Sequence, residues 1–249
     1  MSLLRINNNV AALNTQRNLN VNSFRLGRTF QKLSSGFRIN TASDGPADLI
    51  ISEGLRGQIG GLRAAIRNTQ EASNLVGIAE GALKEISDLL VSMRALATHA
   101  ANRGVVTDEQ RAADQEEVDN MLRTINRINA ATRFAGESIF TGSARTFHLG
   151  EGGTPEDQVS NLIIPVVSTG QIASVRGTLG AFQKNTLQTN INSLSVSLEN
   201  VTATESYIRD TNVAEETSSF TRNQILVQAG VSVLAQANVQ SQSVLQLLG

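Results

Sequence analysis

The chain has 249 residues, of which 40% are hydrophobic and only 4% aromatic, and its formal net charge is −1. This near-neutral charge gives no support for nucleic acid binding, and the absence of cysteine excludes disulfides and thiolate metal sites. No stretch reaches the roughly 18 apolar residues of a membrane span, and the N-terminus has no apolar segment of the signal-peptide type. The scarcity of aromatic rings favours helices packed side by side over an enzyme with a carved pocket.

The first segment, residues 1–43, is predicted to be an assembly helix followed by a connector. It contains six basic side chains and no acidic one before Asp44. Large apolar residues recur at helical spacing and stop before Gly36, and glycine commonly follows the last turn of a helix. The apolar positions that we expect at an assembly interface here are Leu3, Ile6, Val10, Leu13, Leu26, Phe30 and Leu33.

A very long helix is predicted over residues 46–102. Asp44 can cap its start, and Pro46 suits an early helical position. Apolar residues then recur at steps of three and four, and a helix of that length would extend about 75 Å. Gly57 and Gly61 are spaced four apart, which indicates that another helix approaches closely at this point.

Two further helices complete a helical rod that we expect over residues 44–222. Thr107 and Gln110 form a capping-box pattern, which predicts a helix over residues 107–130. A heptad pattern of aliphatic residues predicts a third helix over residues 185–222, in side-by-side and slightly supercoiled contact with its neighbours.

A small β-hairpin is predicted near residues 145–167, where the helical period is lost. Two short strands are expected, at residues 145–149 and 161–167, with a glycine-rich turn between them. Because Pro165 cannot donate a backbone hydrogen bond, we place the second strand at an edge.

The last segment, residues 223–249, contains no charged residue and no histidine. Solvated helices normally carry charge on their outer face, so a helix without any is suited to enclosure on most sides. Two apolar stripes run along it, and we predict that both termini are mobile in the monomer and become ordered only on assembly. The expected interface positions are Leu226, Val227, Val231, Val233, Leu234, Val244, Leu245, Leu247 and Leu248.

Enzymatic chemistry has no support in the sequence. There is no glycine-rich phosphate loop, no His–Glu metal motif and no nucleophile motif. His99 and His148 are the only histidines and fall on different elements. We therefore expect no catalytic, cofactor-binding or metal-binding residues. The basic stripe of Arg56, Arg63 and Arg67 is interpreted as a solvated face or as ion-pair partners for a neighbouring subunit.

Both ends of the chain resemble bacterial flagellins. The N-terminal likeness includes the run Leu33-Ser34-Ser35-Gly36-Phe37-Arg38-Ile39-Asn40, and the C-terminal likeness is nearly continuous. It covers about residues 1–150 and 185–249 in the same order. The segments that carry it are 33–44, 80–86, 94–102, 224–238 and 244–248.

The resemblance implies a mainly α fold. Its parts are a long antiparallel, coiled-coil-like helical rod, a small β-hairpin, and N- and C-terminal helices that pair on assembly as an inner tube. It also implies a structural subunit that self-assembles into the extracellular bacterial flagellar filament for swimming and is exported unfolded through the flagellar channel. The implied partners are other copies of the chain, the flagellar junction and cap proteins, the export apparatus and an export chaperone.

The middle of the chain is short. Only residues 168–182 separate the second expected strand from the returning helix, so the outer domains common in flagellins are missing. The filament is therefore expected to be thin and smooth. Two alternatives stay open: a hook–filament junction protein, which shares the terminal patterns, and a soluble helical adaptor module.

Some flagellins are recognised by a Toll-like receptor of innate immunity. Leu96 and Glu117 match two positions of the recognised motif, whereas Ser92 stands where recognised members have an arginine. Losing a charged donor at such a contact can cost about 2 kcal/mol or more, so we expect this recognition to be impaired.

Overall fold

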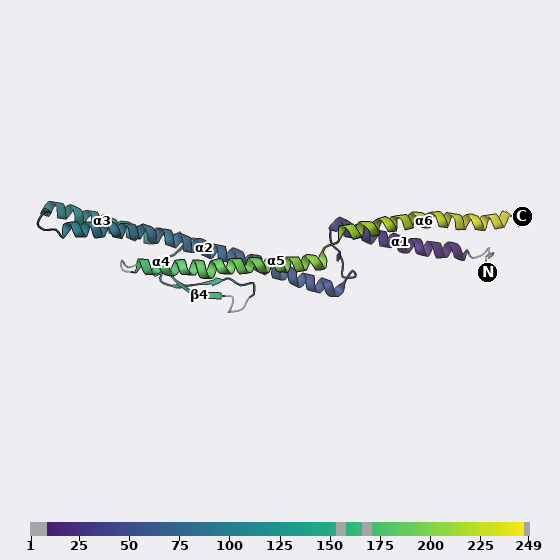
Figure 1. The fold of residues 1–249 in the computed structure, drawn as a ribbon, viewed down its shortest axis with the longest axis horizontal. Coiled ribbons are helices and arrows are strands. Elements are labelled where there is room, and N and C mark those ends of the chain that lie inside the picture. Colours follow the sequence, from purple (N-terminus) through teal and green to yellow (C-terminus); the bar gives the residue numbers. More distant parts are fainter. Residues whose placement is uncertain (1–8, 153–157, 166–170, 247–249) are drawn as a thin grey trace. The chain divides into compact units, whose positions relative to one another are not determined.

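The computed structural model describes residues 9–152, 158–165 and 171–246, with the backbone alone for residues 158–161 and 240–246. The chain is mainly helical, with two small antiparallel sheets (Figure 1). Its backbone contacts divide it into two units. One combines Met1–Arg56 with Thr202–Gly249, and the other is Gly57–Val201.

The first unit pairs α1 (Val10–Ser35) with α6 (Val213–Gln246), which lie side by side (Figure 1). Asn9 caps α1, and its side chain accepts a hydrogen bond from the backbone N–H of Ala12 at 3.0 Å. The helix ends at Gly36, whose φ of 75° lies in the left-handed region that favours glycine. The stop predicted at Gly36 is therefore confirmed.

The second unit is built around α2 (Pro46–Ala100), which enters it from the first unit. A short turn leads to α3 (Asp108–Ala131), whose capping box between Thr107 and Gln110 is complete. Both helices agree with the predicted ranges to within two residues. The capping side chains satisfy backbone N–H groups that have no partner within the helix.

The returning helix differs from the prediction of a single element over residues 185–222, which is wrong. Three segments precede α6: α4 (Ile172–Ala181), the π-helical η2 (Phe182–Gln188) and α5 (Thr189–Arg209). Asn212 separates α5 from α6, because its side chain accepts hydrogen bonds from the N–H groups of Ala214 (3.2 Å) and Glu215 (3.4 Å). The helical run also begins earlier than expected, inside the stretch 168–182 taken for a connector.

The π-helical segment has a cause in the spacing of the core residues. Ile172, Leu179, Leu187 and Leu194 are all buried. They are separated by seven, eight and seven positions, so one interval carries an extra residue. A π turn accommodates such an insertion without rotating the following residues off the core face.

The predicted hairpin is present as β3 (Ala144–His148) and β4 (Gln158–Ile163). The strands are antiparallel, with Arg145 opposite Leu162 and an irregularity in the register next to it. β4 begins earlier than the expected range 161–167 and ends at Ile163. It ends before Pro165, because proline has no N–H with which to continue the ladder. A second, shorter ribbon of β1 (Arg133–Phe134) and β2 (Glu137–Ser138) was not predicted.

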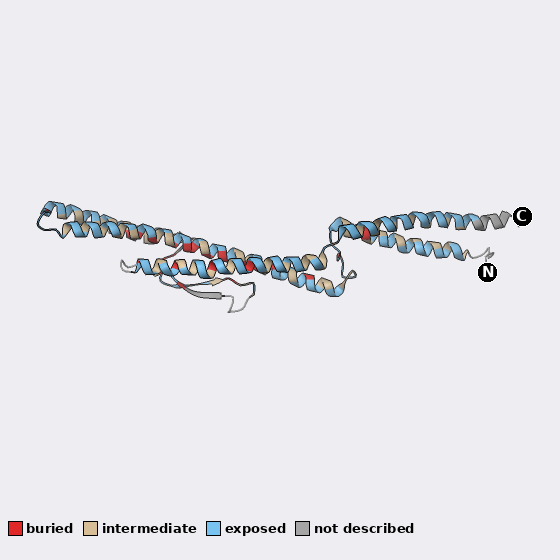
Figure 2. Ribbon diagram, viewed as in Figure 1, coloured by how far each residue is buried: buried red, intermediate tan, exposed pale blue. Residues whose placement is uncertain are grey.

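The main core lies in the second unit, where α2 contacts α3, α4, η2 and the hairpin. Val76, Ala79, Leu83 and Leu187 have no exposed surface. Figure 2 shows the buried positions along α2 and its neighbours, whereas α1 and α6 are exposed over most of their length. The first unit therefore has little core of its own.

Asn190 of α5 connects three elements of the second unit. Its Nδ2 donates to the carbonyl oxygen of Leu149 at 2.8 Å and to Oγ1 of Thr69 at 3.3 Å. Thr69 lies buried on α2, and Leu149 is the buried residue that follows β3. These bonds fix the hairpin against the two helices.

Candidate assembly surfaces

The contact between α1 and α6 is a seam of half-buried residues spaced alternately by three and four positions. That spacing is typical of helices in coiled-coil contact. Thr29 is buried, and the other members are partly exposed. On α1 the seam contains Ala12, Thr15, Leu19, Asn22, Leu26, Thr29 and Leu33, and on α6 it contains Glu216, Phe220, Asn223, Val227, Gly230, Leu234 and Ala237.

Large apolar side chains also point away from the seam. Val10 and Leu13 of α1 are 56% and 61% exposed, and Val231 and Val233 of α6 are 53% and 55% exposed. Large apolar side chains exposed in this number on two paired helices indicate a site of association. We call all the exposed large apolar side chains of the two helices together the exposed apolar face: Val10, Leu13, Val21, Phe24 and Phe30 of α1 with Ile225, Leu226, Val231, Val233 and Val239 of α6.

The residues predicted at the interface fall into three groups. Leu26, Leu33, Val227 and Leu234 belong to the seam within the chain, so their partners include the chain's own second helix. Val10, Leu13, Phe30, Leu226, Val231 and Val233 lie on the exposed apolar face. Leu3, Ile6, Leu247 and Leu248 lie outside the described residues, and Val244 and Leu245 lie in the part of α6 described by its backbone alone.

Sequence reasoning missed part of the exposed apolar face. Phe24 is 68% exposed, and Val21 is also exposed, but neither is among the interface positions predicted for the first segment. The available signal was Phe24 itself, because a large ring on a solvent-facing position of a helix is unusual. The Arg28 guanidinium lies 6.0 Å from the centre of that ring.

The connectors of the first unit are joined to each other by backbone hydrogen bonds. The N–H of Arg38 donates to the carbonyl oxygen of Arg209 at 2.7 Å, and that of Thr211 donates to Gly36 at 2.8 Å. Arg209 also donates to Glu53 at 2.8 Å, and its guanidinium lies 4.9 Å from the centre of the Phe37 ring. The pKa of Glu53 is lowered, most strongly by the hydrogen bond from Arg209 and next by the hydrogen bond from Arg56.

Asp44 holds the connector between α1 and α2. Its carboxylate accepts hydrogen bonds from the N–H groups of Asn40 (3.2 Å) and Thr41 (2.9 Å) and from the Thr41 hydroxyl (2.9 Å), and it contacts the Arg28 guanidinium. Burial alone would raise the pKa of Asp44. The hydrogen bonds from Thr41, Asn40 and Arg28 outweigh that effect and lower the pKa to about 2.

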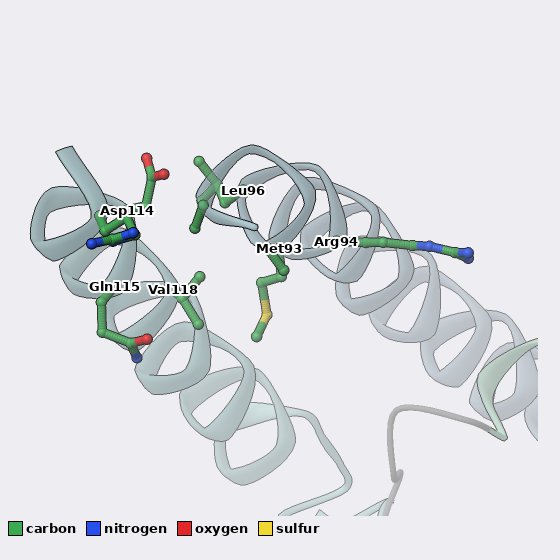
Figure 3. Close-up of a pocket in the computed structure, with 9 residues that line it drawn as sticks. Met93, Arg94, Leu96, Asp114, Gln115 and Val118 are labelled. Carbon is green, nitrogen blue, oxygen red and sulfur yellow. The ribbon is translucent and has the colours of Figure 1, made fainter. Parts of the chain in front are cut away.

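A groove of about 330 Å³ lies between the ends of α2 and α3 (Figure 3). Met93 and Val118 point toward one another across it, whereas Arg94 points away. The groove is lined mostly by apolar side chains, and Leu96 is among them. Asp114 lies at its edge and is 2.7 Å from Nδ1 of His99.

One of the residues matched to the immune-receptor motif lines this groove. Leu96 is half-buried in its wall, and Glu117 is exposed on α3 beside Val118. Ser92 is exposed, but its hydroxyl donates to the carbonyl oxygen of Asp88 at 3.2 Å. It therefore offers no charged donor where an arginine would reach outward.

The basic stripe on α2 is divided. Arg56 donates to Glu53 at 2.9 Å, while Arg63 and Arg67 are exposed and form no ion pair with the rest of the described chain. Within the described chain, the close neighbour of Gly61 is the loop after β3 and not another helix. A Cβ atom on Gly57 would meet nothing within 4 Å.

The described ranges contain neither a candidate metal cluster nor a candidate membrane-spanning helix. No group of three or more histidine, cysteine, aspartate or glutamate side chains in these ranges could hold a metal ion. Within the same ranges, no helix is long and apolar enough to cross a membrane.

Comparisons with known proteins match almost the whole chain. Residues 6–145 match the model of the bacterial flagellin N-terminal helical region, and residues 168–248 match that of the C-terminal helical region. The chain is 35% identical to a flagellin of Bacillus subtilis (98% of this chain, 100% of the relative) and 37% identical to one of Halalkalibacterium halodurans (98% and 99%). It is 34% identical to the flagellar filament 31.3 kDa core protein of Treponema maltophilum (98% and 99%).

These relatives also bear on the alternatives. The alignment with the Bacillus flagellin spans 307 positions against 249 residues in this chain, in agreement with a short form. The matches favour a filament subunit over a junction protein or a soluble adaptor, and they identify a structural protein that is not an enzyme. With both family models matched over residues 6–145 and 168–248, the chain belongs to the bacterial flagellin family.

Proposed function

We propose that the chain builds its polymer by placing the exposed apolar face of α1 and α6 against other copies of itself. As a flagellin, it is a subunit of the extracellular flagellar filament and serves motility. The observation that carries the proposal is the exposed apolar face, which lies on helices that already use another stripe to pair with each other.

The energetics favour burial of this face. Removing a large aliphatic side chain from water contributes about 1.5–3 kcal/mol when burial is complete. The five exposed members on α6 alone therefore offer several kcal/mol for each subunit added. A helical polymer needs heterologous contacts that do not close into a ring. Each subunit must therefore carry two different surfaces: the exposed apolar face, and a second surface that binds the exposed apolar face of a neighbouring copy.

We also propose that the terminal helices α1 and α6 become ordered only when subunits assemble. The first unit has few buried residues, so its helices gain little from packing in a single chain. Amide hydrogen exchange tests this directly. In the monomer we expect fast exchange in residues 223–246 and slow exchange in residues 76–86, with both slow in the filament. Equal protection in the monomer would contradict the proposal.

The polymerisation test removes residues 223–249. We expect the truncated chain to remain soluble, to keep the helical second unit, and to form no filaments by sedimentation or negative-stain microscopy. As a matched variant of full length, Ile225, Leu226, Val231 and Val233 are replaced together by glutamine. This variant keeps a helix that can pair with α1 but loses the exposed face. Filaments of parental stiffness from either chain would refute the proposal.

Further partners are proposed from the family. We expect the chain to pass through the flagellar export apparatus, aided by an export chaperone, and to assemble between junction and cap proteins. The matches to both terminal regions of flagellins support this. A host deficient in the export apparatus should retain the chain inside the cell, while an otherwise identical competent host carries it outside. Equal release from both hosts would argue against this route.

Recognition by a Toll-like receptor is proposed to be weak. Leu96 lines the groove between α2 and α3 and Glu117 is exposed on α3, but Ser92 lacks the guanidinium of the recognised motif. Purified monomer should activate a receptor reporter less than a Ser92→Arg variant does. Full activation by the parent chain would contradict this expectation.

A further inference from the structure

We propose that Gly230 and Leu19 lock the register between α6 and α1, so that Gly230 is a positioning residue for assembly. This inference rests on the proposed function, because the register decides which parts of the exposed apolar face lie at the same level. All the residues involved lie in the first unit, along the seam between α1 and α6.

Contacts along the seam show the register. A Cβ atom on Gly230 would lie 3.1 Å from Cδ1 of Leu19, so Leu19 packs directly against the glycine backbone. Toward one end, Nδ2 of Asn9 donates to the carbonyl oxygen of Ala237 at 3.0 Å. Toward the other, Lys32 lies 3.8 Å from Glu216. Residue numbers rise on α1 as they fall on α6, so the two helices are antiparallel.

In this register each large seam residue meets a small or polar one. Leucines of α1 face glycine, asparagine or glutamate, and the large residues of α6 face threonine or asparagine of α1. Such alternation fills the space between two helices without overpacking. Extending the register set by the Leu19–Gly230, Asn9–Ala237 and Lys32–Glu216 contacts along both helices places Ala12 opposite Ala237, Thr15 opposite Leu234, Asn22 opposite Val227, Leu26 opposite Asn223, Thr29 opposite Phe220, and Leu33 opposite Glu216.

A slip by one seam position destroys this pattern. Leu19 would then face Val227, and Leu26 would face Phe220, which forces large side chains together. Asn22 would face Asn223, which groups polar side chains in the half-buried seam. The alternation therefore disfavours this slip without any special residue.

A slip by a full heptad preserves the alternation of large and small residues, so another feature must disfavour it. Leu19 would then face Asn223, which is also polar but carries a side chain where Gly230 has none. Glycine is the one seam residue of α6 that leaves room for Leu19 to reach the helix backbone. The depression at Gly230 therefore distinguishes the observed register from this slip. The heptad slip in the opposite direction would place Leu26 at Gly230, but it would lose the contacts of Lys32 with Glu216 and of Asn9 with Ala237. Either slip would displace α6 by about 10 Å along α1 and break the composite apolar face presented to neighbours.

Two variants test this register lock: one fills the depression at Gly230, and the other exchanges the large and small residues between α1 and α6. Gly230→Leu removes the depression, and the double variant Leu19→Ala with Gly230→Leu places the large residue on α6. Gly27→Leu is the matched control, because a Cβ atom on Gly27 of α1 would meet nothing within 4 Å. All variants are made in a background with Ala12→Cys and Ala237→Cys, since the chain has no native cysteine.

Disulfide formation between the two introduced cysteines reports the register. The Asn9 side chain already bridges Ala12 and Ala237, so these positions are close only in the observed register. Oxidation is measured on soluble protein and on sedimented polymer, and polymer yield is measured separately. We expect Gly230→Leu to lower both the cross-linked fraction and polymer yield by about tenfold or more. The double variant should restore both, and Gly27→Leu should leave the cross-link at the parental level.

Each outcome decides the proposal. Parental cross-linking and polymerisation in Gly230→Leu would overturn it, as would a double variant that stays as impaired as the single one. A parent background that forms no cross-link in either state would refute the register itself. If the cross-link responds as expected but no chain polymerises, the register lock stands and the proposed function fails.

Discussion

Gly61 of α2 lies so close to the carbonyl oxygen of Glu151 that a Cβ atom on the glycine would be 2.8 Å from it. Asn68 lies two turns further along α2 and also contacts the hairpin. Its Nδ2 donates to the carbonyl oxygen of His148 at 3.1 Å. The backbone at the end of β3 and just after it therefore packs directly against α2, and this close contact is possible because Gly61 has no side chain.

Replacing Gly61 by alanine is expected to destabilise the monomer by about 1–3 kcal/mol, because the new methyl group collides with backbone and not with a flexible side chain. The neighbouring Gly60 is the control, since a Cβ atom there would meet nothing within 4 Å. Gly60→Ala should stabilise α2 by about 0.5–1 kcal/mol through helix propensity. Thermal unfolding by circular dichroism measures both. Equal shifts in the two variants would show that the hairpin does not press on Gly61.

Acid should weaken the connector held by Asp44. Its pKa is lowered from 3.8 to about 2 in the folded chain. A group with a depressed folded pKa contributes stability above its unfolded pKa and loses that contribution as the pH falls through the folded one. We therefore expect Asp44→Asn to cost on the order of 1–2 kcal/mol at neutral pH. The difference from the parent should shrink between about pH 4 and pH 2.

Urea unfolding of parent and Asp44→Asn at several pH values measures this difference, with the signal followed in the first unit. Glu215→Gln provides a control, because Glu215 is exposed and forms no ion pair within the described residues. A gap between parent and Asp44→Asn that stays constant down to pH 2 would contradict the assigned role of the carboxylate.

Polymerisation and helix pairing should respond to different faces of α6. Val233 is 55% exposed, whereas Val227 is half-buried in the seam. Val233→Asn is expected to leave monomer helicity unchanged and to raise the critical concentration for assembly by about tenfold, since it removes roughly 1–2 kcal/mol of burial per contact. Val227→Asn should weaken the seam itself, so that assembly falls and the helicity gained on assembly falls with it. The reverse pattern would place the seam, and not the exposed face, between subunits.

The π-helical segment should tolerate a deletion that α5 does not. Removing Asn185 from η2 shortens the long interval between Leu179 and Leu187 to seven residues and allows a continuous α-helix. We expect stability within about 1 kcal/mol of the parent. Deleting Ser195 from α5 instead turns Leu198 and Val201 away from the buried cluster of Leu62, Ala65 and Leu194, and should destabilise by several kcal/mol. Calorimetry of the two variants distinguishes them, and equal losses would exclude the proposed cause of the π turn.

Sequence alone determined the helices whose ends carry their own chemistry. The start of α3 follows from Thr107 and Gln110, and the end of α1 follows from Gly36, because capping groups act within one turn of their own helix. The small ribbon β1–β2 escaped prediction for the converse reason. Its turn places Ala135 at φ 50° and Gly136 at φ 87°, and alanine at such a position gives no local signal.

Periodicity also showed that the terminal helices carry apolar faces, but it could not say which stripe meets which partner. Leu33 and Phe30 both fit a helical stripe, yet Leu33 lies in the seam and Phe30 is 61% exposed. The tertiary structure decided this, because seam residues are chosen by what faces them on α6. The same holds at Gly61 and Gly230. Sequence spacing identifies a face of a helix, whereas only packed neighbours determine what that face contacts and how closely.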